Sequence, residues 1–378
     1  MHKWKIIFIG LMSIVFFTGC WDKVEIDKRA FITMFGVDKY NEQEKASDIK
    51  RNRYVITFEY ANTGLIAGKV QGKPNFLMTS VGINANDIID LINTRINKTA
   101  YFGHLKAVVI GEEFAKEEKL LREILDVIER SPSIGRKVNL MITPSLQKDV
   151  LKVNLEEQPV LGLFVRDLVK KRVSSRVADA DLGYILRSLH ESRAAIVPRI
   201  IPDDKGIKIA GAAVLKDFKM VGYLGEIETN ALMYMLDKMK DSVVNVSVDN
   251  LIIPMEITET KTKMKVFEKD GKIITSFEVK GEGDLTQHLF EVRNQPLDNK
   301  YINKLEKALS KKIQEQIKST YKKIQKDFGA DLVQAGEYLR KHEPNTWDKV
   351  KDNWDEIFPK TEVVVHVDMK IRRVGVTQ

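Results

Sequence analysis

The thiol of Cys20 has the most distinctive chemistry in this sequence, because it is the only cysteine among 378 residues. A lone cysteine excludes an intrachain disulfide, a redox CxxC pair and a cysteine-rich zinc site. Its position indicates a different reaction. Two lysines precede the uncharged, mainly apolar run Ile6–Phe17, which ends in Thr18 and Gly19 directly before Cys20. As a helix, this run reaches only about 18 Å, too short to cross a hydrocarbon core of about 30 Å.

A basic start, a short apolar stretch and small residues before a cleavage site are typical of an export signal. The residues Phe17-Thr18-Gly19-Cys20 resemble a lipobox, the processing site of bacterial lipoproteins, with phenylalanine where leucine is usual. The resemblance implies cleavage between Gly19 and Cys20, with diacylglycerol on the Cys20 sulfur and an N-acyl group. Two acyl chains, at about 0.8 kcal/mol for each buried CH₂ group, are enough for stable anchoring. An uncleaved N-terminal anchor with an incidental cysteine is the alternative.

Other local signs of catalysis are weak. The six histidines form no HExxH or other close ligand pair; they are His2, His104, His190, His288, His342 and His366. Gly281-Glu282-Gly283 lacks the third glycine of a nucleotide-binding loop, and we interpret it as a turn. Ser131–Gly135 lacks the first glycine of GxSxG and is typical of a helix stop.

Two aspartate pairs, Asp179 with Asp181 and Asp203 with Asp204, lack EF-hand spacing. A helix cap and a turn are the simpler interpretations. From these patterns we expect no enzyme, no catalytic residue, no cofactor and no metal site.

The elements that would position these residues alternate in type as far as residue 200. Periodicity predicts strands at Ala30–Asp38, Arg53–Tyr60, Leu105–Ile110 and Val138–Ile142. It predicts helices at Asn84–Asn97, Glu113–Arg130, Leu161–Arg172 and Asp181–Ser192. This alternation favours a mixed α/β region with crossover helices, which has room for two subdomains.

The prolines and polar turn residues of Pro198–Gly206 favour a domain boundary near Pro202. We therefore expect a signal peptide at 1–19, an N-terminal mixed α/β region at 20–200 and a C-terminal α+β domain at 203–378. In that domain, expected strands include Val243–Val248, Ile252–Val266 and Lys272–Lys280, with a type I′ turn at Asp270-Gly271.

A long amphipathic helix is expected at 298–328. Its apolar residues recur with a mean spacing of about 3.7, nearer to a straight helix than to a coiled coil; they are Ile302, Leu305, Leu309, Ile313, Ile317, Tyr321, Ile324 and Phe328. We therefore expect it to pack on a sheet. Its many lysines suggest a solvated face, with contact to anionic lipid or a partner as the alternative. Trp347 and Trp354, seven residues apart, are interpreted as core packing rather than an aromatic ligand platform.

Composition agrees with a folded body. Hydrophobic residues make up 43% and charged residues 30%, which excludes a mostly disordered chain and a polytopic membrane protein. The net charge of +8 suits an anionic surface but gives no reason to expect a nucleic acid partner.

Several segments resemble the Ger(x)C family of spore germination lipoproteins. The most specific is Gly19-Cys20-Trp21-Asp22-Lys23-Val24-Glu25-Ile26, which leads into Ala30-Phe31-Ile32 and Gly36-Val37-Asp38. The later segments follow in the family's order: His104–Gly111, Ala210–Leu215, Val221–Leu224, Trp347, Trp354–Pro359 and Ile371–Gly375. Departures are Phe17 in the lipobox and Arg130-Ser131-Pro132, where Arg-Asp is expected.

The resemblance implies the C subunit of a germinant (nutrient) receptor in an endospore-forming bacterium. It implies three mixed α/β domains, and a lipid-anchored location on the inner spore membrane or cell membrane that faces outside the cytoplasm. The partners would be two integral membrane subunits of the same receptor and the bilayer, and no catalytic residues carry over. Its role could be to stabilise the receptor, to sense nutrient or to relay the signal.

Two other classes of function stay open. A stand-alone solute-binding lipoprotein of the cell envelope would require a hinge between two similar lobes, and the sequence shows no duplicated half. An envelope hydrolase would require a nucleophile and a base, and the sequence shows no such set.

The first prediction concerns the anchor. Cys20→Ala removes the sulfur that would carry diacylglycerol, so the variant should lose metabolic lipid labelling and should leave the membrane fraction. Wild-type fractionation of the variant would show that the lipobox interpretation is wrong.

Overall fold

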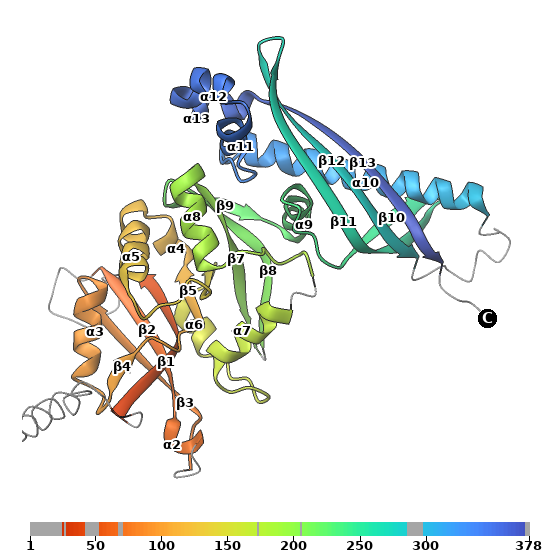
Figure 1. Ribbon diagram of the computed structural model, residues 1–378. Helices are drawn as coiled ribbons and strands as arrows, with labels where there is room; N and C mark the ends of the chain where they lie inside the picture. Colours follow the sequence, from red (N-terminus) through yellow and green to blue (C-terminus); the bar gives the residue numbers. More distant parts are fainter. Residues whose placement is uncertain are drawn as a thin grey trace, which may run out of the picture.

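The computed structural model describes residues 25, 28–41, 53–66, 71–171, 174–204, 206–285 and 298–374. Cys20 and the expected signal peptide lie outside these residues. Figure 1 shows two sheets at the two ends of an elongated body, each with helices against it.

The first sheet has nine strands among the described residues, in the order β3-β2-β1-β5-β6-β7-β8-β9, with β4 beside the start of β1. The strands are β1 (Arg29–Lys39), β2 (Tyr54–Ala61), β3 (Asn75–Gly82), β4 (Thr99–Tyr101), β5 (Ala107–Gly111), β6 (Asn139–Thr143), β7 (Ala194–Asp203), β8 (Gly206–Lys216) and β9 (Lys219–Leu224). The central pairs β1–β5, β5–β6 and β6–β7 are parallel, and the outer pairs are antiparallel. The sheet is therefore mixed, as the alternation of strands and helices predicted.

Helices cover both faces of this sheet. They are α2 (Thr63–Ile66), α3 (Ala85–Asn93), α4 (Glu112–Ala115), α5 (Glu118–Arg130), α6 (Gln147–Leu151), α7 (Leu161–Lys171) and α8 (Leu182–Ser192). The apolar sides of α3, α5 and α8 share a core with Ile32, Phe35 and Val37 of β1. The helices α6 and α7 pack on the opposite face, against a separate core that includes Met34.

The second sheet has the order β10-β11-β12-β13. Its strands are β10 (Ser242–Val248), β11 (Leu251–Lys269), β12 (Lys272–Leu285) and β13 (Glu362–Val374). The helices and 3₁₀ turns of this half are α9 (Glu226–Met235), α10 (Asn299–Lys326), α11 (Ala335–His342), α12 (Pro344–Val350), η3 (Lys351–Asn353), α13 (Trp354–Ile357) and η4 (Phe358–Lys360). The β11–β12 turn is the expected type I′ turn, because Asp270 and Gly271 both have positive φ, 52° and 74°.

The long helix α10 lies along one face of this sheet, as Figure 1 shows. The central residues of its apolar stripe are fully buried, in the register that the spacing predicted; they are Leu305, Leu309, Ile313, Ile317, Tyr321 and Ile324. Near the C-terminal end of α10 the Tyr321 hydroxyl donates to Thr275 of β12 at 2.9 Å. The expectation that this helix packs on a sheet is confirmed.

The first sheet continues past Pro202, where the sequence suggested a boundary. Pro202 pairs with Ile207, and β8 then pairs with β9, so both strands extend the N-terminal sheet. Pro198 lies beside a register irregularity, where a residue without an N–H is tolerated. The second sheet begins only after α9. The position of the domain boundary stays a prediction.

Two local expectations were wrong. The expected helix Glu113–Arg130 is two helices, α4 and α5, separated at Lys116 and Glu117. Gly281 and Gly283 lie inside strand β12 rather than in a turn. A Cβ at these two glycines would lie only 2.7 and 2.8 Å from backbone carbonyl oxygens of β11, so only glycine permits this close strand approach.

The second prediction tests the α10 interface. Leu309→Asp places a carboxylate in a fully buried site without a partner, and should lower the free energy of unfolding by at least about 3 kcal/mol. Lys311→Asp, on the exposed side of the same helix, should change it by less than about 0.5 kcal/mol. Denaturant unfolding measures both, and a wild-type midpoint for Leu309→Asp would mean that the stripe is exposed.

Candidate functional site

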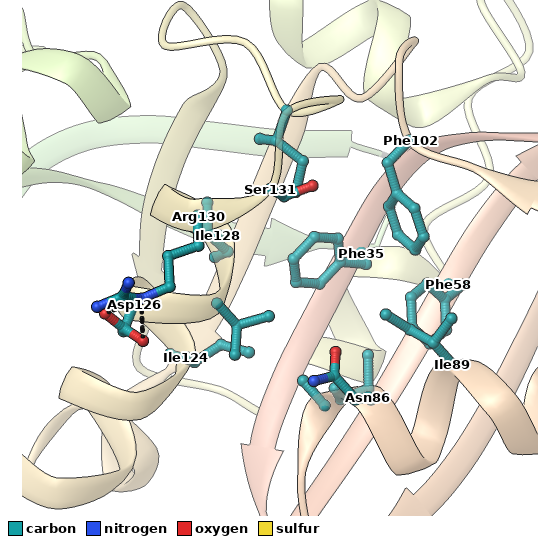
Figure 2. A pocket seen from close by; sticks show the side chains of 14 residues that line it. Phe35, Phe58, Asn86, Ile89, Phe102, Ile124, Asp126, Ile128, Arg130 and Ser131 are labelled. Atoms are coloured by element: carbon teal, nitrogen blue, oxygen red, sulfur yellow. Dashed lines mark hydrogen bonds and ion pairs between the residues drawn. The ribbon is translucent and has the colours of Figure 1, made fainter.

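A hollow of the N-terminal half lies between α3 and α5, over the face of strands β1 and β2. It has a volume of about 410 Å³ and is open to solvent on one side. Figure 2 shows its lining side chains. Helix α3 contributes Asn86 and Ile89, and α5 contributes Ile124 and Ile128.

Three phenylalanine rings form the deep wall of this hollow. Phe35 of β1, Phe58 of β2 and Phe102 of the β4–β5 loop have ring centroids 5.8 to 6.4 Å apart. Phe35 and Phe58 are almost fully buried, so the sheet holds their positions. Aromatic and aliphatic walls of this kind favour an apolar group and supply little directional bonding.

The rim of the hollow carries its charged groups. The Arg130 Nε donates to both carboxylate oxygens of Asp126, at 2.8 and 2.9 Å, on the last turn of α5. Asn86 and Ser131 are the other polar lining residues, and the Ser131 hydroxyl lies 3.1 Å from that of Ser133. The lining contains no histidine, lysine or cysteine. The hollow is therefore suited to binding an apolar group beside a paired acid and base, and its lining offers no nucleophile–base pair.

A second hollow, of about 380 Å³, lies where the two halves of the protein meet. The Arg193 guanidinium, at the end of α8, donates to Asp217 of the β8–β9 turn and to Asp355 of α13. On the other side of the hollow, Trp347 and Trp354 contact each other edge to face, with centroids 5.7 Å apart. They belong to separate helices rather than to one helical face, but both pack against the core, as expected.

Asp331 is the buried charged group of this second hollow. Its carboxylate accepts hydrogen bonds from the backbone N–H groups of Ala335 and Gly336, both at 2.8 Å, and from the Trp354 indole at 3.1 Å. Burial raises the pKa of the Asp331 carboxyl, although the hydrogen bonds that it accepts act in the opposite direction. The three donors hold the start of α11 against α13, so we assign Asp331 a structural role.

The aspartates weighed as cation ligands have ordinary roles. Asp181 caps α8 by accepting from the Tyr184 N–H at 2.8 Å, and Asp203 ends β7 at the hairpin. No group of three or more metal-ligating side chains occurs in the described ranges. In that same part of the chain, no helix has both the length and the apolar character that crossing a membrane requires.

Two family models account for most of the sequence. Residues 22–202 match the spore germination protein N-terminal domain, and residues 210–375 match the model described as spore germination B3/GerAC like, C-terminal. The chain belongs to the Ger(x)C family. This is a family of spore germination proteins and not a known enzyme family.

Relatives match along their whole length. Spore germination protein B3 of Bacillus subtilis (strain 168) is 25% identical over 99% of this chain and 98% of its own. Spore germination protein KC of the same organism is 26% identical over 99% and 97%. The crystal structure of the GerBC protein superposes with a TM-score of 0.61 at 21% identity, and covers 86% of this chain and 95% of that one. That likeness confirms the mixed α/β, multidomain fold, and the relatives support a germination-related role.

Sequence reasoning missed the first hollow. Phe35 and Phe58 lie in strands that are buried on both faces, where any aromatic residue fits, and Phe102 follows an element too short to predict. Their only signal in the sequence was their aromatic type, which also fits ordinary core.

The third prediction tests the structural role of Asp331. Asp331→Ala leaves two buried backbone N–H donors and the half-buried Trp354 indole without their acceptor, and should lower the free energy of unfolding by about 3 kcal/mol. Asp352→Ala removes an exposed carboxylate that lines the same hollow, and should be nearly neutral. Chemical unfolding followed by tryptophan fluorescence measures both. Equal stability of the two variants would contradict this role.

Proposed function

We propose that this chain is a lipid-anchored, non-enzymatic subunit of a spore germinant receptor, needed for nutrient-triggered germination. It acts with two integral membrane subunits on the inner spore membrane, and its body faces outside the cytoplasm. The observation that carries the proposal is the collinear match to germination proteins over nearly the whole chain. A match that long includes both halves of the body, so the proposal concerns the whole protein rather than one shared domain.

The anchor supports a receptor role. Acylation of Cys20 would confine the body to the membrane surface, where partners embedded in the bilayer are concentrated. The two hollows support the non-enzymatic part of the proposal, because neither lining offers a nucleophile with an adjacent base. The body would then act by binding its partners rather than by catalysis.

The apolar hollow favours a second candidate, a stand-alone solute-binding lipoprotein. Its size and walls suit one small apolar molecule. Isothermal titration with amino acids and sugars separates the candidates. Heat of binding that Ile89→Trp abolishes would support solute capture, and no heat would favour the scaffold.

The fourth prediction addresses the receptor role in spores. Deletion of the chain, in a background without paralogues, should abolish germination by one nutrient class and leave germination by unrelated triggers intact. Cys20→Ala should weaken the same response, because the soluble body loses its high effective concentration beside its partners. The optical density loss of spores after nutrient addition measures both.

Normal germination of the deletion strain with every nutrient would overturn the receptor role. Turnover of a small molecule by the purified body would overturn the non-enzymatic assignment.

A further inference from the structure

One end of the N-terminal sheet gathers the first residues of the body and an edge strand. Ile32, near the start of β1, pairs with Tyr60 of β2, and Tyr60 pairs with Phe76 of β3. Adjacent strands lie about 4.8 Å apart, so Phe76 is only about 10 Å from the entering chain. In Figure 1 this end, with α2, is remote from the second sheet and from α10.

This end exposes large apolar side chains on a rigid support. Phe76 and Leu77 are 42% and 40% exposed, and as neighbours in a strand they point to opposite faces. The Phe76 ring lies 5.3 Å from that of Tyr60. The preceding residue, Asn75, donates hydrogen bonds to Glu59 at 2.7 Å and to the Pro159 carbonyl at 3.0 Å. This end of the sheet is therefore fixed in position.

The buried carboxylate of Glu59 provides that support. It accepts from the Thr33 hydroxyl at 2.6 Å and from the Leu161 and Gly162 N–H groups at 2.6 and 2.9 Å, at the start of α7. The edge strand, the central strand and α7 are thus joined through one side chain.

The strands and loops of this end are rich in cations. Acidic groups also lie nearby: Lys28 pairs with the exposed Glu25 at 3.3 Å, and the exposed Glu156 and Glu157 precede Pro159. No aspartate or glutamate occurs between Tyr60 and Asp87 or between Asp90 and Glu112. Lys73 is exposed, Lys98 donates to the Thr63 hydroxyl of α2 at 3.1 Å, and the Arg29 guanidinium lies 4.4 Å from the centre of the Tyr101 ring.

Lys106, which precedes β5, extends this basic character to the α7 side of the sheet. Burial lowers the pKa of Lys106, and the nearby charges of Arg166 and Lys170 act in the same direction.

The proposed anchor limits how far this end can lie from the bilayer, and in this respect the inference rests on the proposed function. Cys20 precedes Lys28 by eight residues. Even a fully extended chain of that length spans at most about 29 Å. The end that carries Phe76, Leu77 and Lys73 therefore stays near the bilayer surface.

We propose that this tip surface, formed by Tyr60, Lys73, Phe76 and Leu77 with Lys28 and Arg29, docks on a membrane that contains anionic lipid. The apolar side chains enter the interfacial layer, and the cations contact headgroup phosphates. Aromatic residues beside Lys and Arg are the composition that favours this layer. The docked tip orients the body, so that the second sheet and α10 point away from the bilayer.

The test uses residues 21–378, because every described core residue lies at or after Ala30. This chain has no cysteine, since Cys20 is the only one. Leu77→Cys can therefore be labelled alone with an environment-sensitive NBD fluorophore. The emission should shift to the blue and brighten with vesicles of phosphatidylcholine and phosphatidylglycerol at 3:1, and should not change with phosphatidylcholine alone.

Matched variants locate the contact. Val364→Cys, at a site 51% exposed on the second sheet, should show no change with either vesicle. Lys28→Glu with Lys73→Glu should weaken partitioning of the labelled Leu77→Cys chain by about tenfold or more. Lys311→Glu with Lys318→Glu, on the exposed side of α10, should leave it unchanged. All these substitutions are at partly or fully exposed sites, and unchanged thermal unfolding verifies that each variant is folded.

The proposal is overturned if residue 77 gives no spectral change with anionic vesicles, or the same change with neutral ones. It is also overturned if the α10 variant, rather than the Lys28 and Lys73 variant, loses partitioning, which would assign lipid contact to the long helix. Because the tested chain lacks Cys20, these outcomes are independent of acylation. Failure of the anchor itself would appear only in the fractionation of Cys20→Ala.

Discussion

Strand β1 is the constraint on which the N-terminal half depends, because it lies between the two cores of that half. It pairs with β2 along one edge, and with β4 and then β5 along the other. Phe35 faces the core under α3 and α5, whereas Met34 faces the core under α6 and α7. A substitution in β1 would therefore disturb both cores. The same strand supplies a wall of the apolar hollow and begins only nine residues after Cys20, so the hollow and the end nearest the proposed anchor share one rigid element.

The second half depends on a different interaction, the apolar stripe of α10 against its sheet. The two halves meet through α9, through the Phe328 ring against Gly222 of β9, and through the ion pair of Arg193 with Asp355. This ion pair is largely exposed, and such pairs contribute little stability. The buried residues of both halves belong to one apolar cluster, so the apolar contacts carry most of the joint.

Much of this architecture could be predicted from periodicity. Leu105–Ile110 is a mainly apolar run typical of a buried strand, and the spacing from Ile302 to Ile324 fits a straight helix. Both elements could be predicted because their apolar residues follow the pattern of burial. Gly281 was wrongly assigned to a turn. Glycine is required there because a backbone carbonyl of β11 lies too close for a Cβ atom, and no local pattern in the sequence reveals that neighbour. Strand β7 was missed because Pro198 and Pro202 suggest a turn, whereas the paired strand tolerates them near an irregularity and at its end. The hollow could not be predicted, since Phe35, Phe58 and Phe102 come together only through the tertiary fold.

The proposed receptor role requires the body to work beside integral membrane subunits of one receptor. Lysine-directed crosslinking in intact spores, followed by mass spectrometry of the isolated inner membrane, tests it most directly. A receptor subunit of this kind should crosslink to two integral membrane proteins, and both sets of crosslinks should be lost in spores that carry Cys20→Ala. Abundant crosslinks to soluble proteins alone, with the chain present and none to an integral membrane protein, would contradict it.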